Sequence, residues 1–154
     1  NLNKLNKLDL SDNKISFIES KSFINQTDLQ TLYLSVNNLT YIENETFRNL
    51  IQLKSLQLDN NQIEYLDSNL FDNCTQLEDL FLHKNRIYLI HDQNLFSKLF
   101  KLKNLNLNQN SIEFLNSNLF KDTKQLRQLN LYDNQIKNLS TEIFQNNHQL
   151  YGLD

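Results

Sequence analysis

One pattern of leucines recurs about every 24 residues along almost the whole chain. Each copy reads leucine, two variable residues, leucine, one variable residue, leucine, two variable residues and asparagine. A fixed period of this size is the signature of a solenoid, in which each unit buries its apolar edge only against its neighbours. The pattern therefore determines most of the interior. Six full copies begin at Leu5, Leu29, Leu53, Leu77, Leu102 and Leu126, and a partial copy begins at Leu150.

The leucine pattern predicts one short strand in each repeat. Alternate residues of a strand face opposite sides, so the second and third leucines point inward and the residues between and around them point outward. Strands of successive repeats then stack about 4.8 Å apart as a parallel sheet along one face of the solenoid.

The asparagine that closes each copy is predicted to have a structural role. A carboxamide carries both hydrogen-bond donors and acceptors. A ladder of such side chains turned inward would satisfy the backbone groups that are freed where the chain leaves the sheet. The ladder residues are Asn13, Asn37, Asn61, Asn85, Asn110 and Asn134.

The second half of each repeat is predicted to return through a capped helical turn that places a phenylalanine in the core. A residue of N-cap type stands three positions before this phenylalanine, or four positions in the fourth repeat. That repeat is one residue longer, so we expect a local bulge near Asp92 to Leu95 without broken stacking. The predicted caps are Ser20, Asn44, Ser68, Asp92, Ser117 and Thr141. The phenylalanines are Phe23, Phe47, Phe71, Phe96, Phe120 and Phe144.

This pattern resembles the leucine-rich repeat family, specifically its 24-residue "typical" class, over essentially residues 5–154. The resemblance implies an α/β solenoid: a curved horseshoe segment with a parallel concave β-sheet and short helical turns or loops on the convex side. It also implies binding of proteins and an extracellular or cell-surface setting, because the pattern is similar to the ectodomains of Toll-like and Slit-like proteins. Such ectodomains usually carry cysteine-rich caps, and this chain does not. We therefore expect residues 1–154 to be a single array taken from a longer one.

Composition and residue spacing argue against several classes of function. The net charge of −3 has both signs interspersed, so no basic stripe predicts a nucleic-acid partner. No apolar run is long enough to cross a bilayer. One cysteine and scattered histidines at His83, His91 and His148 make neither a metal site nor a catalytic cluster. We expect no enzyme activity, no cofactor, no metal and no membrane insertion by this segment.

Cys74 is interpreted as a core residue. It stands three positions after the recurring phenylalanine, where Leu50 and Leu99 stand in other repeats. Free cysteine is among the most buried residue types, so we expect a small core filler here and not a reactive thiol.

The side chains that face outward from the strands are the candidates for ligand binding. Aromatic residues supply much of the binding energy at protein interfaces, so Tyr33, Phe81 and Tyr132 are the predicted anchors. Asp59 and His83 occupy equivalent positions in adjacent repeats, and a pH-sensitive contact between them is a further hypothesis. The alternatives are ordinary exposed aromatics and a solvated surface pair. The predicted ligand-binding residues are Tyr33, Gln57, Asp59, Asp79, Phe81, His83, Asn106 and Tyr132.

A second column of mostly large residues follows the ladder asparagines, and we call it the flank stripe. The favoured interpretation is a wider margin of the core, and the alternatives are a second binding flank or an edge for dimerisation. The functional alternatives predict that Tyr41 and Tyr65 are substantially exposed. The flank stripe consists of Phe17, Tyr41, Tyr65, Leu89, Phe114 and Asn138.

Five Asn-x-Ser/Thr triplets are candidates for N-glycosylation, and none lies in the outward columns of the strands. Asn25 and Asn73 share one position on the convex side and are expected to be modified first. A glycan on Asn44 would compete with its predicted role as a helix cap. The five candidates are Asn25, Asn38, Asn44, Asn73 and Asn138.

These patterns predict an extracellular recognition module that binds a protein ligand through its concave face, as part of a receptor, secreted or adhesion ectodomain. One alternative is a structural or adhesion spacer that forms a homodimer through a lateral edge. Another is an intracellular scaffold in the cytoplasm. The varied, partly aromatic outward residues favour the first function, whereas the flank stripe supports the spacer. The identity of the ligand does not follow from the sequence.

Overall fold

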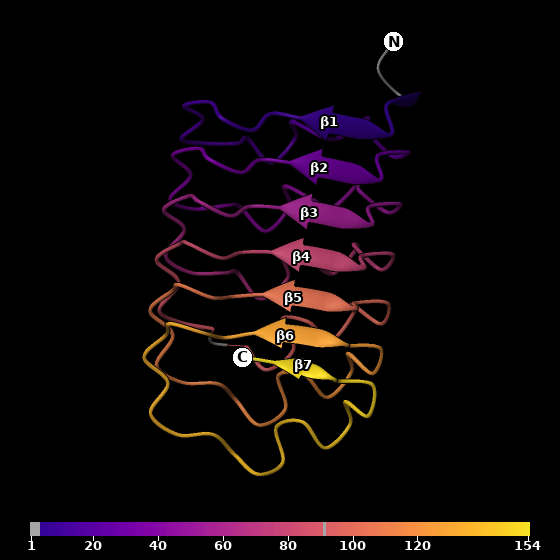
Figure 1. The fold of residues 1–154 in the computed structure, drawn as a ribbon. Coiled ribbons are helices and arrows are strands. Elements are labelled where there is room, and N and C mark those ends of the chain that lie inside the picture. Colours follow the sequence, from indigo (N-terminus) through magenta and orange to yellow (C-terminus); the bar gives the residue numbers. More distant parts are fainter. Residues whose placement is uncertain (1–3, 91) are drawn as a thin grey trace.

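A computed structural model describes residues 4–90 and 92–154, which form a solenoid along one parallel sheet of seven short strands (Figure 1). The strands lie in the sheet in chain order, and every neighbouring pair is parallel and in register from one repeat to the next. They are β1 (Lys7–Asp9), β2 (Thr31–Tyr33), β3 (Ser55–Gln57), β4 (Asp79–Phe81), β5 (Asn104–Asn106), β6 (Gln128–Asn130) and β7 (Gly152–Leu153).

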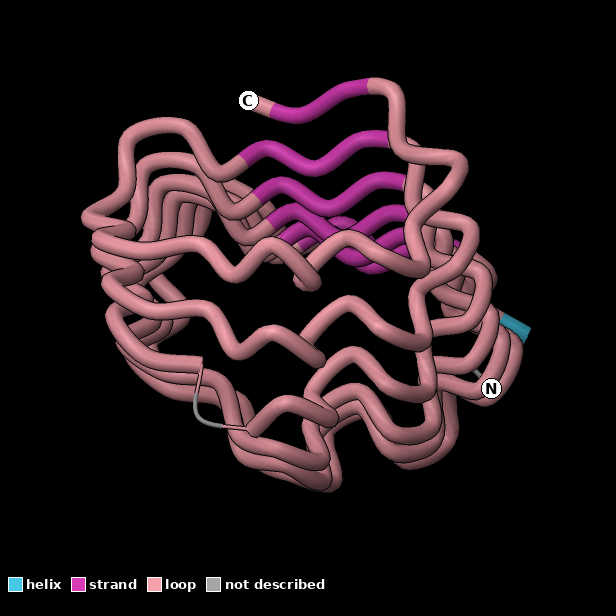
Figure 2. The backbone as a smooth tube through the Cα atoms, turned by 90° about the horizontal axis from the view of Figure 1, so that it is seen from below, coloured by secondary structure: helices cyan, strands magenta, loops and turns pink. Residues whose placement is uncertain are grey.

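The strands form one side of the solenoid, and loops and turns close the rest of each coil (Figure 2). The predicted parallel sheet with one strand per repeat is therefore confirmed. The strands are short because each one contributes a single inward leucine between two outward residues, as Leu56 does between Ser55 and Gln57 in β3. In-register stacking follows because every repeat offers the same apolar edge to the next.

The core consists of columns of identical residues that run from repeat to repeat. The central leucines from Leu32 to Leu129 are at most 2% exposed. On the return side, the phenylalanine rings stack on one another with centroids 5.8 to 6.4 Å apart and interplanar angles of 5° to 22°. These distances lie within the range of favourable aromatic pairs. The predicted phenylalanine spine is confirmed.

The ladder asparagines join each coil to the one before it. In the third repeat, the Asn61 amide nitrogen donates to the carbonyl of Leu34 at 3.0 Å and to that of Leu58 at 3.1 Å, while its oxygen accepts the backbone N–H of Leu39 at 3.0 Å. The same set of bonds recurs at Asn37, Asn85, Asn110 and Asn134. Asn13 is exposed and donates only within its own repeat, to Leu10 and Ser11.

The residue before each ladder asparagine has a left-handed backbone, with φ between 52° and 55°. This conformation turns the chain out of the strand so that the carboxamide can point inward. Asparagine and aspartate tolerate it well, but a β-branched residue does not. Val36 therefore sits in a strained conformation, and with 48% of its surface exposed it gains little packing in return. The six residues are Asp12, Val36, Asn60, Lys84, Gln109 and Asp133.

The predicted cap positions were wrong in five of the six repeats. The first turn of the return stretch begins four residues before the phenylalanine in every repeat, where a carbonyl accepts the N–H three residues later. Asn116 and Ser140 occupy this position and also accept a side-chain bond from the N–H two residues on, as Asp92 does. The predicted caps in the other repeats stand one position too late and do not begin this turn. They are Ser20, Asn44, Ser68, Ser117 and Thr141. Successive i to i+3 turns take the place of a helix.

The additional residue of the fourth repeat is also placed differently from the prediction. Residues 92–95 make the same turn as residues 116–119, with Leu95 N–H donating to the Asp92 carbonyl at 3.2 Å. No bulge is therefore present at residues 92–95. In the other repeats the turn begins directly after the preceding isoleucine or leucine, but in the fourth repeat one residue separates Ile90 from Asp92. The additional residue is therefore residue 91, which lies outside the described residues. The expected continuity of stacking is confirmed, since Phe71 and Phe96 lie 6.3 Å apart.

Cys74 lies in the core and is fully buried, as predicted. Its sulfur is 3.9 Å from the carbonyl oxygen of Phe47 in the preceding repeat. Asn147 occupies the same position three repeats later and donates to the equivalent carbonyl, that of Phe120, at 3.1 Å. Burial raises the pKa of the Cys74 thiol to about 12, so the nucleophilic thiolate is suppressed.

The end repeats are less buried than the central ones. Leu5 and Leu8 are partly exposed, whereas their equivalents Leu29 and Leu32 are fully buried. Leu153 in β7 is 50% exposed. The division into six full repeats and a partial one, as a segment of a longer array, stays a prediction.

Replacing Asn61 by alanine is expected to lower the free energy of unfolding by about 3 kcal/mol, because it leaves the buried Leu39 N–H without a partner and removes one of the two amide donors from each of the Leu34 and Leu58 carbonyls. The matched control is Asn13→Ala, which removes only exposed bonds and should cost less than about 1 kcal/mol. Urea denaturation followed by circular dichroism measures both values. Equal destabilisation by the two changes would contradict a ladder that joins the coils.

Cys74 is expected to be inert to thiol reagents at pH 8 in the folded chain and to react fully after unfolding. Above the ordinary thiol pKa of 9.0, the unfolded chain loses this proton while the folded chain keeps it until about pH 12. The free energy of unfolding should therefore fall by about 1 kcal/mol per pH unit in that window, relative to Cys74→Leu. Identical pH profiles of denaturation for the two proteins would contradict this result.

Candidate functional site

The outward residues of the seven strands form a continuous surface, which we call the sheet face. The strands β2 to β6 each present two outward side chains around one buried leucine, and a third outward column follows them. Seven of the eight predicted ligand-binding residues on this face are half-buried by their neighbours. The eighth, Tyr132, is 65% exposed. The half-buried ones are Tyr33, Gln57, Asp59, Asp79, Phe81, His83 and Asn106.

The three predicted aromatic anchors do not form one patch. Tyr33 and Phe81 lie two strands apart in β2 and β4, a separation of about 10 Å at ordinary strand spacing. Tyr132 follows β6 in the third column. Lys7 places its ammonium group 4.7 Å from the centre of the Tyr33 ring, and the Phe81 ring meets His83 edge-on at 6.4 Å. The sheet face therefore offers separate aromatic points on a polar surface.

Asp59 is the centre of a small polar cluster on the sheet face. One carboxylate oxygen accepts the Ser35 hydroxyl at 2.6 Å, and the other accepts the Asn60 amide at 2.8 Å. His83 Nε2 lies 3.5 Å from the second oxygen, so the predicted neighbours do meet. His83 Nδ1 has no hydrogen-bond partner within the part of the chain that is described. The pH-sensitive contact stays a hypothesis.

Ser35 thus joins the predicted pair of Asp59 and His83, so a serine, an aspartate and a histidine come together. Their order does not suit nucleophilic catalysis. In a catalytic triad the histidine lies between the serine and the acid and removes the serine proton. Here Asp59 lies in the middle, and the Ser35 hydroxyl donates a hydrogen bond to this carboxylate, not to the histidine, while Ser35 itself is only 8% exposed. The cluster can hold Asp59 in place, but it does not activate Ser35.

The flank stripe is only partly a core margin: the exposure expected of a functional surface is met at Tyr65 and not at Tyr41. Phe17 is 54%, Tyr65 is 42% and Phe114 is 59% exposed. Tyr41 and Leu89 are half-buried, and the Tyr41 and Tyr65 rings lie 5.1 Å apart. Burial and the nearby Asp67 carboxylate raise the pKa of the Tyr41 hydroxyl. The stripe therefore presents a second, more apolar surface beside the sheet face.

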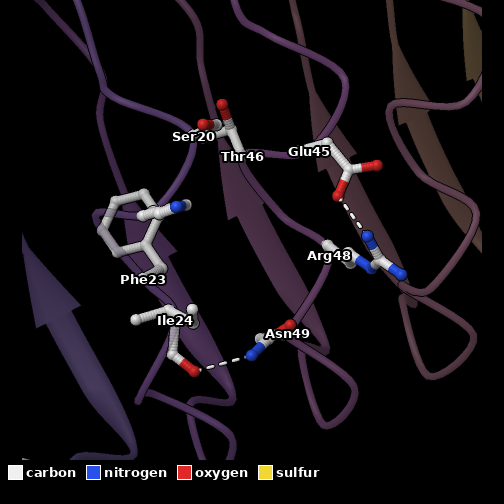
Figure 3. A pocket seen from close by; sticks show the side chains of 8 residues that line it. Ser20, Phe23, Ile24, Glu45, Thr46, Arg48 and Asn49 are labelled. Atoms are coloured by element: carbon white, nitrogen blue, oxygen red, sulfur yellow. Dashed lines mark hydrogen bonds and ion pairs between the residues drawn. The ribbon is translucent and has the colours of Figure 1, made fainter.

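A hollow of about 290 Å³ opens on the return side between the first two repeats (Figure 3). Thr46 stands there at a position that is leucine in the next three repeats, and its hydroxyl lacks a partner among the described residues. Arg48 is paired with Glu45 at 2.6 Å, and the Asn49 amide donates to the Ile24 carbonyl at 2.6 Å. The side chains of Arg48, Glu45 and Asn49 are therefore already hydrogen-bonded within the protein. Few polar groups in the hollow remain free to bind a ligand.

Four of the five glycosylation candidates are exposed: Asn25, Asn38, Asn73 and Asn138. Asn44 is half-buried. Because the cap lies at the preceding residue, the expected competition between capping and a glycan at Asn44 does not arise. Asn25 and Asn73 stand on the return side, opposite the sheet face, whereas Asn138 belongs to the flank stripe.

The described residues contain no group of three side chains that could hold a metal ion. None of the helices within the same residues is long and apolar enough to cross a membrane. His148 is exposed on the return side, away from His83, and His91 lies outside the described residues.

Comparison with known proteins points to one family. A model of the BspA type leucine rich repeat region matches residues 16–151 in six copies, and a leucine rich repeat model matches residues 4–25. No curated protein sequence matches the chain significantly.

Solved structures of repeat proteins are similar over most of this chain. The leucine-rich repeat domain of APL1B is 25% identical with a TM-score of 0.79, covering 85% of this chain and 39% of that one. The Toll–Spatzle complex from Drosophila is 28% identical with a TM-score of 0.84, covering 92% and 18%. The TLR13–ssRNA13 complex is 26% identical with a TM-score of 0.79, covering 99% and 26%. The chain thus spans well under half the length of each of these proteins.

Proposed function

This chain belongs to the leucine-rich repeat family, whose fold is typical of protein-recognition modules, and on that premise we propose that it binds a protein ligand through its sheet face. The supporting observation is the contrast between the two sides of the sheet. Inward positions repeat leucine in every strand, whereas outward positions change from repeat to repeat. The central outward column reads Asp9, Tyr33, Gln57, Phe81, Asn106, Asn130 and Asp154.

Such variation suits recognition of one specific partner. A spacer needs only solubility on this face, so interchangeable polar residues would serve it. Half-buried aromatics such as Tyr33 and Phe81 are already held by neighbouring side chains. Their own side chains therefore lose little conformational entropy when a partner covers them. Asp59 and His83 add polar groups with defined positions. The proposed binding surface therefore combines rigid aromatic points with oriented polar groups.

We place this module outside the cell. The Toll protein, to which this chain is similar, forms a complex with Spatzle, and a secreted protein ligand would meet an exposed repeat array in the same way. The exposed Asn25 and Asn73 triplets support this location, because glycans at both positions would leave the sheet face open. TLR13 forms a complex with single-stranded RNA. The charge of this chain, −3, supports a protein ligand over a nucleic acid.

A second candidate function is self-association through the flank stripe. The exposure of Phe17, Tyr65 and Phe114 favours it, since several exposed large aromatic residues along one edge of a fold can mark an interaction surface. The two functions use different faces of the solenoid, and variants can therefore separate them.

The binding test screens the secreted chain against a panel of extracellular proteins beside a Tyr33→Ala, Phe81→Ala, Tyr132→Ala variant. Loss of such anchors is expected to weaken binding of the partner at least about thirtyfold, since each anchor contributes on the order of 1–2 kcal/mol. Surface plasmon resonance gives the affinities, and thermal unfolding confirms that both proteins are folded.

The matched control for this test is Phe17→Ala, Tyr65→Ala, Phe114→Ala, which likewise removes three aromatic rings but from the flank stripe. It should leave the affinity for the partner unchanged. A partner that is retained by the sheet-face variant and lost with the flank variant would overturn the proposal. Loss of a dimer in the flank variant, measured by light scattering, would instead support self-association.

Secretion of the chain from eukaryotic cells is expected to yield glycans at Asn25 and Asn73. Enzymatic removal of N-glycans should then lower the mass, and Asn25→Gln combined with Asn73→Gln should remove most of that difference in mass spectrometry. Thr27→Ala and Thr75→Ala should have the same effect, because each change destroys the triplet and keeps the asparagine. A secreted chain whose mass is unaffected by the enzyme would count against the extracellular proposal.

A further inference from the structure

The only glycine of the chain, Gly152, opens a hollow on the sheet face. Gly152 begins β7, at an outward position where every earlier strand carries a side chain, for example Asn104 in β5 and Gln128 in β6. Its backbone does not have a positive φ. The glycine is therefore not needed for an unusual backbone conformation, and its effect is to leave space above the sheet.

This hollow has a volume of about 220 Å³ and lies across β4 to β7. Its walls are made largely of carboxamide side chains, with one aromatic ring at the end nearest the centre of the sheet. No lysine, arginine or histidine lines it within the described part of the chain. The lining includes Phe81, Asn104, Asn106, Gln128, Asn130 and Asp154.

The carboxamides in this hollow are oriented by the protein itself. The side-chain oxygen of Asn106 accepts the N–H of Asn108 at 3.1 Å, and that of Asn130 accepts the N–H of Tyr132 at 3.0 Å. These turns occupy the oxygens and leave both amide nitrogens without a protein acceptor among the described residues. Asn106 and Asn130 are partners in the register of β5 and β6, so their backbones lie about 5 Å apart and each residue has an amide free to donate.

We infer that this hollow binds a neutral saccharide unit. A sugar ring offers hydroxyls that both donate and accept, together with an apolar face of C–H groups. The amides of Asn106 and Asn130 would donate to hydroxyl oxygens, Gln128 and Asp154 would accept from hydroxyls, and Phe81 would cover the apolar face. The inference rests on the proposed function, since the saccharide would belong to the glycan of a ligand that docks on the same face.

The charges on this part of the sheet favour a neutral sugar over an acidic one. Asp154 lines the hollow, and Asp79 beside it accepts the Asn104 amide at 2.5 Å. A sulfate or carboxylate on the sugar would be repelled by these two carboxylates, and no lysine, arginine or histidine among the described lining residues would balance it. Carboxamides carry no net charge and therefore impose no such cost on hydroxyls.

The decisive variant is Gly152→Gln, which restores the side chain of the preceding repeat and fills the hollow. It should fold normally, because a Cβ at Gly152 would come no closer than 3.4 Å to any atom, the nearest being the flexible Gln128 Cγ. The matched control is Gly152→Ala, which adds only that Cβ and leaves most of the hollow open.

A second variant, Asn130→Asp, keeps an oxygen for the Tyr132 N–H and replaces the amide donor by an acceptor of the same shape. It tests the hydrogen-bond chemistry without changing the shape of the hollow. Thr31→Ala serves as a control on the same face, because Thr31 in β2 neither lines the hollow nor belongs to the predicted ligand-binding residues.

The experiment presents immobilised neutral, sialylated and sulfated oligosaccharides to the purified chain and measures affinity for the strongest ones by isothermal titration calorimetry. We expect neutral sugars to bind, and Gly152→Gln and Asn130→Asp each to weaken binding at least about tenfold. Gly152→Ala and Thr31→Ala should change it by less than about threefold. Capture of no sugar, preference for acidic sugars, or binding that is indifferent to Gly152→Gln would each overturn the inference.

A partner from the protein screen separates this inference from the proposed function. Its affinity is measured before and after enzymatic removal of its glycans, with the wild type and with Gly152→Gln. A loss on deglycosylation that Gly152→Gln reproduces supports the saccharide site. A partner that binds through Tyr33 and Phe81 but is unaffected by either treatment overturns the saccharide site and leaves the proposed function in place.

Discussion

The hydrogen bonds of the ladder asparagines are the interaction on which the solenoid depends. A coil that leaves a three-residue strand must turn sharply, and its backbone groups then lose their partners in the sheet. Asn61 restores three of these bonds with one side chain, two of them to the preceding coil. No apolar residue can substitute, since it offers neither donor nor acceptor. The leucine and phenylalanine columns supply the burial, and the asparagine makes that burial compatible with the backbone.

This arrangement separates stability from recognition. Inward positions are constrained by the same neighbours in every repeat, so Leu56 or Phe71 has little freedom to change. Outward positions touch only adjacent side chains and are free to vary, as the change from Tyr33 to Gln57 to Phe81 along one column illustrates. A surface built in this way can be altered one residue at a time without loss of the core. That property suits a family whose members bind unrelated partners.

Departures from the repeat are more informative than the repeat itself. Gly152 removes a side chain from the sheet face and opens a hollow, whereas Thr46 replaces a core leucine and opens one on the return side. Only the first is surrounded by oriented, unpaired polar groups. Val36 departs in a different way, since a β-branched residue occupies a left-handed position. Positions of this kind indicate where a repeat protein has specialised, because the repeat alone does not require them.

The sequence by itself determined the solenoid, the register of its strands, the phenylalanine spine and the burial of Cys74. These follow from residues that recur at a fixed spacing, and each repeat contacts only its neighbours. The tertiary structure alone decided the cap positions and the exposure of Phe17 and Phe114, because the pattern does not tell how far a loop residue stands from the core. It also decided the hollow beside Gly152 and the hydrogen bond from Ser35 to Asp59, whereas the contact of Asp59 with His83 was predicted from the repeat. Both depend on which side chains from adjacent coils meet, and that is a property of the packed coils rather than of any one repeat.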